Sequence, residues 1–277
     1  MQKHLISIMS IAGSDCSGGA GIQADIRAAA KCGVFASTVV TAVTTQNSHG
    51  MSEMIVMSPE TVISQMKSIF ADSRPMAIKI GMLGSIDVGM AVAKFLKDYC
   101  GGIPIVIDPV IKASAGGNLT TEAEAMADFY KSELSPLASI VTPNLNEAKE
   151  FGVSDKMQED IAIELLNTLK CRSVTLKGGH SEGDFITDTL AFHNEKGQVG
   201  VLALSASKIE CRNLHGTGCT YSSILAAQLA KGSSIEEAFA TAFWLMKGLI
   251  SASSGYTLGD SAYGPLNLFN YHIGASQ

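Results

Sequence analysis

A cysteine that directly follows a glycine-threonine-glycine turn is the first group in this chain with the means to do chemistry. The stretch reads Leu214-His215-Gly216-Thr217-Gly218-Cys219-Thr220, and helix-forming sequence follows from Tyr221 to Ala230. Glycine lets the backbone turn sharply and approach a ligand closely. The first turn of a helix also carries free N–H groups and the positive end of the helix dipole, where phosphate commonly binds. The pattern therefore predicts an anion site.

The thiol of Cys219 has several possible roles at such a site. The positive potential of a helix start lowers the pKa of a thiol and favours the thiolate, which suits a nucleophile or a general base. A buried cysteine can also be a small hydrophobic packing residue. The loop by itself leaves these roles open.

Further candidate residues follow the predicted strands at the points where these strands end. In an open parallel sheet, ligands bind beyond the carboxyl ends of the strands, so such residues should lie close together. They include Gly13, Asp15, Asp25, Gln46, Asn47, Met82, Asp108, Asn144, Glu147, Lys177 and Cys219. Acids, a lysine and an anion loop on one sheet edge suit phosphoryl transfer, in which an enzyme mainly positions groups and neutralises charge.

Three charged residues of this set have chemistry that fits phosphoryl transfer. Asp108 and Glu147 are candidate ligands for Mg²⁺, with water completing the shell because Mg²⁺ dehydrates reluctantly. Lys177 is a candidate contact for a phosphate oxygen. Each residue also has a plain structural explanation, since an aspartate at a strand end often caps the next turn and a lysine there is often solvated.

The first glycine-rich turn supports a different class of function. Gly19-Ala20-Gly21-Ile22-Gln23-Ala24 matches G-x-G-x-x-A after a predicted strand, as in nicotinamide-dependent oxidoreductases. However, six residues separate Ala12 from Gly19, and Gln46 stands where an acid should bind the ribose. The sequence also has no G-x-x-x-x-G-K-[ST] phosphate loop. Phosphate recognition is therefore assigned to the Cys219 loop.

The pattern of apolar residues predicts the elements that position these groups. Strands are expected at 5–12, 38–43, 77–81, 105–108, 139–142, 174–177, 186–192 and 199–204, and helices at 20–31, 59–70, 85–99, 121–134, 146–151, 158–170, 221–230 and 235–251. The last two strands form a hairpin. Strands otherwise alternate with helices, which predicts an α/β fold with a mainly parallel central sheet covered on both faces. No repeat or linker interrupts 1–277, so one domain is expected.

Composition argues against several classes of protein. The 277 residues are 46% hydrophobic and 17% charged, as in a compact folded protein. The net charge of -6 argues against a nucleic-acid partner, because phosphate backbones recruit basic surfaces. No apolar run is long enough to span a membrane, and the six scattered cysteines show neither zinc-site nor disulfide spacing. A cytoplasmic protein without membrane or nucleic-acid partners is expected.

Several segments of the chain occur in the same order in one enzyme family. They are Ala12–Asp25, Thr41–Asn47, Lys79–Leu83, Asp108–Val110, Thr142–Glu147, Lys177–His180 and His215–Thr220. Through them the chain resembles the hydroxymethylpyrimidine/phosphomethylpyrimidine kinases of thiamine biosynthesis, over about Ile8 to Gly232. The resemblance implies a single ribokinase-like three-layer α/β/α domain and a homodimer. It also implies ATP- and Mg²⁺-dependent phosphorylation of 4-amino-5-hydroxymethyl-2-methylpyrimidine and then of its monophosphate.

The resemblance further implies a role for each matching residue. The pyrimidine would contact Gln46, Gly13, Asp25, Met82 and Val110, with Gln46 bonded to the aminopyrimidine edge. ATP would contact Lys177, Thr217 and Asn144, while Asp108 and Glu147 would serve Mg²⁺. The turn from Gly216 through Gly218 to Cys219 would form the anion hole for the transferred phosphoryl group. Cys219 stands where many relatives have an aspartate base, so it is a candidate base as well as part of the hole.

Two features depart from the family pattern, and one alternative lies within the same class. Cys16 replaces the usual proline of the first turn, which changes the stiffness of that turn. The run after Val110 lacks the common lysine-serine-glycine spacing, which puts lid contacts of Lys112 and Ser114 in doubt. A pyridoxal kinase is the main alternative, because some cysteine-bearing relatives also accept vitamin B6 compounds. A ligand-binding relative without catalytic activity is a further alternative.

Overall fold

The computed structural model describes residues 4–111, 123–154, 157–179, 183–258 and 264–269. The strands are β1 (Ser7–Asp15), β2 (Phe35–Asn47), β3 (Gly50–Val56), β4 (Ala77–Ile80), β5 (Ile105–Ile107), β6 (Ile140–Val141), β7 (Ser173–Leu176), β8 (Phe185–His193) and β9 (Val199–Ser207). The α-helices are α1 (Gly21–Lys31), α2 (Pro59–Asp72), α3 (Ile86–Tyr99), α4 (Ala123–Phe129), α5 (Leu145–Glu150), α6 (Gln158–Leu169), α7 (Thr217–Ala230) and α8 (Ile235–Ser253).

These strands form one sheet in the order β3-β2-β1-β4-β5-β6-β7-β8-β9. The neighbours from β2 to β7 are parallel, whereas β3 pairs with β2 and β8 pairs with both β7 and β9 in antiparallel fashion. The predicted α/β fold with a mainly parallel sheet and a terminal hairpin is therefore confirmed. Parallel order also brings the carboxyl ends of β1, β4, β5, β6 and β7 to one edge, where the candidate residues follow.

Strand β3 is not among the strands predicted from the sequence. It pairs with β2 at the edge of the sheet, from Ala42 opposite Val56 to Asn47 opposite Gly50. None of its residues is fully buried, and Ile55 is 57% exposed. An edge strand that is accessible on both faces does not need the alternation of apolar and polar residues by which strands are recognised.

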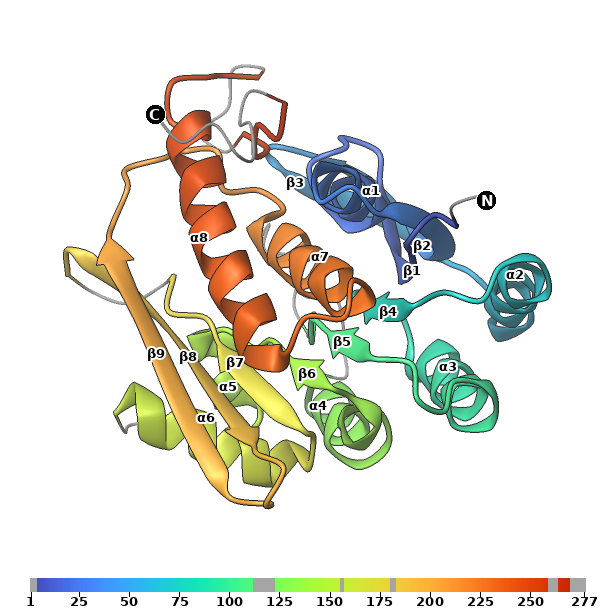
Figure 1. Ribbon diagram of the computed structural model, residues 1–277. Helices are drawn as coiled ribbons and strands as arrows, with labels where there is room; N and C mark the ends of the chain where they lie inside the picture. Colours follow the sequence, from blue (N-terminus) through green and yellow to red (C-terminus); the bar gives the residue numbers. More distant parts are fainter. Residues whose placement is uncertain (1–3, 112–122, 155–156, 180–182, 259–263, 270–277) are drawn as a thin grey trace.

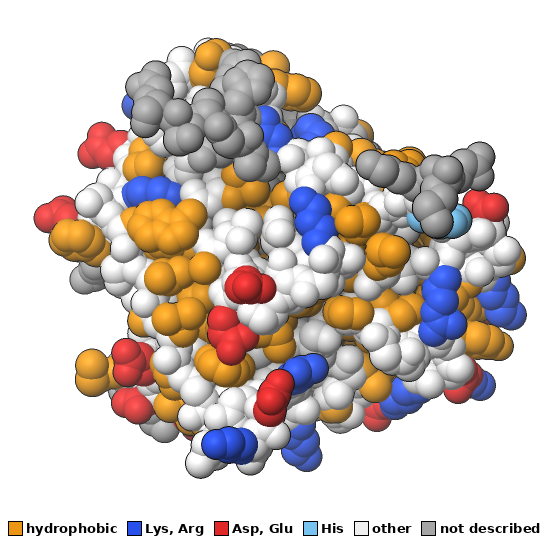
Figure 2. Space-filling view, viewed as in Figure 1, with side chains coloured by type: hydrophobic (Ala, Val, Ile, Leu, Met, Phe, Trp, Pro, Cys, Tyr) orange, Lys and Arg blue, Asp and Glu red, His pale blue; other side chains and the backbone are white. Residues whose placement is uncertain are grey.

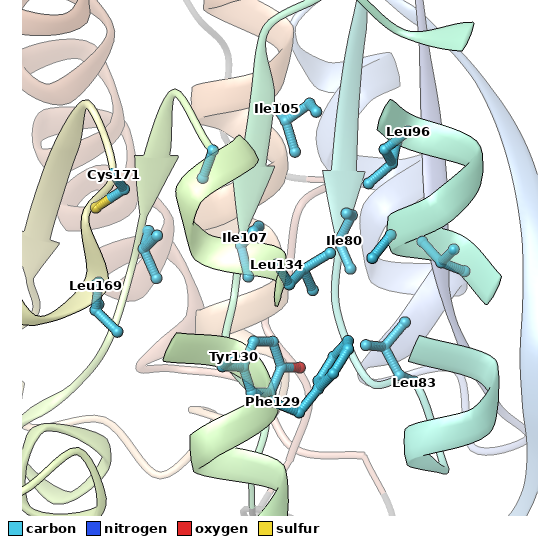
Figure 3. Close-up of a cluster of buried hydrophobic side chains, with 14 of the residues drawn as sticks. Ile80, Leu83, Leu96, Ile105, Ile107, Phe129, Tyr130, Leu134, Leu169 and Cys171 are labelled. Carbon is cyan, nitrogen blue, oxygen red and sulfur yellow. The ribbon is translucent and has the colours of Figure 1, made fainter. Parts of the chain in front are cut away.

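Helices cover both faces of the sheet and enclose two hydrophobic cores (Figure 1). Helices α2, α3, α4 and α6 lie on one face, and α1, α7 and α8 lie on the other. Alternate residues of β1 enter different cores, with Met9 on the first face and Ile8 on the second, because successive side chains of a strand point to opposite sides. Figure 3 shows the first core, where Ile80 and Ile107 of the sheet meet Tyr130 and Leu134.

The helix predicted at 121–134 is interrupted. Helix α4 ends at Phe129 and passes into a π-helical turn over Tyr130–Leu134 and a 3₁₀ turn over Ser135–Leu137. Pro136 lies in this second turn and has no N–H with which to continue an α-helix. The wider turn places Tyr130 fully inside the core.

The surface over α7 and α8 mixes charged side chains of both signs with separate hydrophobic ones (Figure 2). Among the helices that the structure describes, none combines the length and hydropathy needed to cross a bilayer. All six cysteines fall within the described residues, and each is a free thiol.

Candidate active site

Helix α7 begins where two glycine-rich loops touch. Gly216 is its N-cap residue with a φ of 83°, and no side chain caps the helix. A Cβ at Gly216 would overlap the carbonyl oxygen of Gly19, and a Cβ at Gly21 would overlap that of Gly13. Glycine is required because the loops meet through their backbones. A Cβ at Gly19 would overlap the His215 ring, so Gly19 and Gly21, the two glycines of the dinucleotide-like pattern, both have a packing reason that involves no dinucleotide.

Two predicted residues lie directly beside the first turn of α7. Asp108 follows β5 and Lys177 follows β7, and the Lys177 Nζ is 2.8 Å from the Asp108 Oδ1. A Cβ built at Gly218 would be 3.2 Å from the Asp108 Oδ2 and 3.5 Å from the Lys177 Nζ. Burial would lower the pKa of Lys177, but the carboxylates of Asp108 and Glu147 raise it, so the side chain stays a cation. The start of α7, a carboxylate and a cation therefore lie close together beside Gly218.

Glu147 joins this cluster from the start of α5. Its Oε2 accepts a hydrogen bond of 2.7 Å from the Asn144 N–H, while the Asn144 Oδ1 accepts from the Glu147 N–H at 2.9 Å. This is a capping box, which fixes both side chains at the helix start. Burial raises the pKa of Glu147 to about 7, with the Lys177 cation lowering it and the Asp108 carboxylate raising it further. Two carboxylates therefore lie within electrostatic reach of each other.

The expected low pKa of the Cys219 thiol is wrong for this structure. Burial of the sulfur raises its pKa to about 11, although the nearby Lys79 cation and the Gly21 N–H lower it. The positive potential of the helix start is thus outweighed by the loss of solvation. At neutral pH, Cys219 is a thiol in this state.

Asp25, an expected contact of the pyrimidine, is buried inside the protein. Its side chain is fully buried, and the Lys79 Nζ lies 2.9 Å from each of its oxygens. The hydroxyls of Ser10 and Ser223 donate to the same carboxylate at 2.5 and 2.8 Å. Both oxygens of this buried carboxylate are engaged by protein donors, so in this structure Asp25 pairs with Lys79.

Gln46, near the end of β2, has a partner that is distant in the sequence. Its side-chain amide nitrogen lies 3.2 Å from the His215 Nε2, and the same Nε2 lies 2.9 Å from the Asp15 Oδ2. Asp15 also accepts hydrogen bonds from the Ser17 N–H and hydroxyl and from the Ala20 N–H. A surface hollow of about 320 Å³ lies beside Gln46, between β2 and β3.

Other expected pocket residues lie near these groups or outside the described chain. Met82 packs against Gly13, where a Cβ would overlap its methyl group. Val110 is half-buried two residues after Asp108, and its N–H donates to the Asp108 carbonyl at 2.8 Å. Lys112 and Ser114 lie outside the described residues.

Lys79, Asp15 and His215 have partners at the site that were not predicted from the sequence. Lys79 is the one charged residue of the strand Ala77–Ile80, and a buried lysine needs a partner. Asp15 sits among glycines and serines, where a carboxylate commonly organises a loop. His215 precedes the anion loop, but its partners are 169 and 200 positions away, so spacing alone does not reveal them.

Comparisons with known proteins identify the family of the chain. A family model described as phosphomethylpyrimidine kinase matches residues 15–267. A hydroxymethylpyrimidine/phosphomethylpyrimidine kinase of Rhizobium meliloti is 38% identical over 266 residues, which cover 95% of this chain and 96% of that protein.

Solved structures give the same answer for the fold. The phosphomethylpyrimidine kinase of Clostridium difficile superposes with a TM-score of 0.72 at 32% identity, over 87% of this chain and 98% of that one. An ADP complex of Bacillus subtilis pyridoxal kinase superposes with a TM-score of 0.80 at 28% identity, over 95% and 97%. The chain therefore belongs to the phosphomethylpyrimidine kinase family and has the fold of these vitamin kinases.

Proposed function

We propose that this chain transfers the γ-phosphoryl group of ATP to 4-amino-5-hydroxymethyl-2-methylpyrimidine, and then to its monophosphate, in thiamine biosynthesis. The observation that carries the proposal is the convergence of Asp108 and Lys177 on Gly218 at the uncapped start of α7. A helix terminus, a cation and a carboxylate at one point form a site for a transferring phosphoryl group. Family membership supports the substrate.

The first turn of α7 supplies the anion hole. Backbone N–H groups and the helix dipole stabilise negative charge without reorganising during the reaction. Lys177 is held at this turn by Asp108 at 2.8 Å, ready to neutralise the ATP phosphates. Thr217 and Asn144 flank the same point, at the start of α7 and of α5, and are the further expected ATP contacts.

Asp108 and Glu147 fit a Mg²⁺ ion. Their mutual repulsion contributes to the raised pKa of Glu147, and a divalent cation near both would relieve it. In the described part of the chain no cluster of three or more His, Cys, Asp or Glu residues could hold a metal. Two carboxylates with water and phosphate oxygens are the usual environment of Mg²⁺, which would neutralise charge on the phosphates.

Cys219 serves this site as a thiol. With a pKa of about 11, it does not readily accept the proton of the substrate hydroxyl at neutral pH. Phosphoryl transfer depends mainly on positioning and on charge stabilisation, so a strong base is not required. Of the two roles expected for Cys219, the raised pKa supports membership of the anion hole over general base.

In this proposal Gln46 forms hydrogen bonds with the edge of the aminopyrimidine ring. Met82 and Gly13 form an apolar wall of the substrate site, and Val110 lies beside Asp108. The family resemblance also implies a homodimer and a cytoplasmic location. Light scattering tests the dimer, which should have twice the chain mass of 29.0 kDa.

Pyridoxal phosphorylation is the second candidate, favoured by the TM-score of 0.80 to a pyridoxal kinase. The test is ADP release by purified protein with Mg²⁺, ATP and one of three acceptors: the hydroxymethylpyrimidine, its monophosphate or pyridoxal. We expect turnover of both pyrimidines and a lower kcat/KM for pyridoxal. Turnover of pyridoxal alone would reject the pyrimidine assignment and leave the phosphate chemistry intact.

A further inference from the structure

The orientation of the Gln46 amide follows from the hydrogen that His215 carries. The His215 Nε2 is 2.9 Å from the Asp15 Oδ2, and these two side chains are only 13% and 4% exposed. A carboxylate oxygen accepts and cannot donate, so the Nε2 must carry a hydrogen for this contact to be favourable.

Asp15 is an ionised acceptor here. Burial would raise its pKa, but hydrogen bonds from His215, Ser17 and the Ala20 N–H together lower it to about 2. Its Oδ1 accepts from the Ser17 N–H at 2.9 Å and the Ser17 hydroxyl at 2.8 Å, and its Oδ2 accepts from Ala20 at 2.8 Å. A proton on this carboxyl would compete with these donors. The hydrogen between Asp15 and His215 therefore belongs to the imidazole.

The same Nε2 also faces Gln46, at 3.2 Å from the end of its amide. An N–H group cannot accept a hydrogen bond from an amide NH₂. Half a turn about the last side-chain bond exchanges the amide oxygen and nitrogen at nearly the same positions. The arrangement in which no two donors face each other then has the amide oxygen toward His215, where it shares the Nε2 hydrogen with Asp15, and the NH₂ group turned away from His215.

Packing holds the imidazole ring in the orientation that its contacts with Asp15 and Gln46 require. A Cβ at Gly19 would overlap the His215 Cδ2, so the ring lies directly on that backbone. The His215 N–H donates to the Gly264 carbonyl at 3.1 Å, which fixes the main chain of the same residue. These contacts restrict both rotation of the His215 ring and movement of its backbone.

We propose that Asp15 and His215 are positioning residues that turn the Gln46 NH₂ group toward the substrate, so that the site prefers a ring bearing a hydrogen-bond acceptor at that point. The inference rests on the proposed pyrimidine substrate. The ring nitrogen beside the amino-bearing carbon is such an acceptor. The second lone pair of the amide oxygen remains for the exocyclic amino group.

The test compares the hydroxymethylpyrimidine with its analogue in which that ring nitrogen is replaced by C–H. The readout is the ratio of kcat/KM for the two compounds. We expect the wild-type protein to prefer the pyrimidine by about tenfold, the effect of one hydrogen bond. His215→Phe keeps a ring against Gly19 but has no N–H, and the preference should fall to about twofold. His215→Gln retains a donor near the Nε2 position and should keep most of the preference.

Gln46→Glu gives a second measurement that does not depend on the folding of the His215 variants. Both of its terminal atoms are acceptors, so the pyrimidine should lose its advantage over the analogue. An unchanged preference in Gln46→Glu or in a folded His215→Phe would overturn the inference and leave the kinase assignment standing. A wild-type protein that phosphorylates neither compound would overturn the proposed function, and this inference with it.

Discussion

Lys79 and Asp25 form an ion pair that is fully inside the protein, with the Nζ 2.9 Å from both carboxylate oxygens. β4 supplies the lysine and α1 the aspartate. Burial would lower the pKa of Lys79, but the carboxylates of Asp25 and Asp108 raise it. The pair thus places a permanent cation close to the anion site, hidden from solvent.

Replacing one of the two residues of this ion pair should lower the urea concentration at which the protein unfolds. Lys79→Met leaves the Asp25 carboxylate buried without its cation, which typically costs about 3–5 kcal/mol in the free energy of unfolding. Lys79→Met combined with Asp25→Leu removes both charges and should recover most of that loss. Urea unfolding followed by circular dichroism measures both. Equal stability of the single variant and the wild-type protein would contradict the prediction.

Gly218→Ala should separate activity from stability. The new Cβ would lie 3.2 Å from the Asp108 Oδ2, so the carboxylate or the helix start must shift. We expect kcat/KM to fall by about tenfold or more, because small misplacements at a reacting centre are costly. Alanine stabilises a helix relative to glycine by about 0.5–1 kcal/mol, so the melting temperature should not fall. Gly101→Ala, which has no atom within 4 Å of its new Cβ, is the matched control.

Cys219→Ala should lower kcat by less than about 10²-fold, because loss of a general base costs about 10²–10⁴-fold. The reason is the pKa of about 11, which keeps Cys219 protonated at neutral pH. Cys219→Ser should retain more activity than Cys219→Ala, since its hydroxyl still donates. A fall of about 10²-fold or more in both folded variants would instead identify the sulfur as the base.

Asp108→Asn should raise the Mg²⁺ concentration required for half-maximal activity by about tenfold, since Mg²⁺ binds carboxylates more strongly than amides. Asp128→Asn removes a carboxylate that is 75% exposed and should leave this concentration unchanged. Activity titrated with MgCl₂ after treatment with EDTA gives both values. An identical requirement in Asp108→Asn and the wild-type protein would remove Asp108 from the metal site.

Asp15 should make the protein sensitive to acid. Its pKa falls from 3.8 to about 2 on folding, so its stabilisation is complete above about pH 4 and is lost as the pH falls toward 2. Asp15→Asn should be less stable than the wild-type protein at pH 7, and the gap in free energy of unfolding should narrow between pH 4 and pH 2. Urea titrations at several pH values test this. A gap that is constant over that range would show that Asp15 does not stabilise the fold through its charge.

The sequence alone determined the local secondary structure and most of the residues that make up the candidate site. Periodic apolar residues predicted the parallel strands and the helices, because a buried strand or helix face must be apolar whatever it packs against. The glycine pairs around Thr217 and the acids after the strands predicted which residues gather at one sheet edge, since parallel strands end on the same side.

Only the tertiary structure decided how these residues are paired and solvated. The thiol of Cys219 has a raised pKa because the surrounding side chains exclude water, and a helix start viewed alone predicts the opposite. Asp25 pairs with Lys79 of β4 because a buried lysine requires a negative partner. His215 reaches Gln46 and Asp15 from far along the chain, and such contacts depend on how the loops pack, which no local pattern encodes.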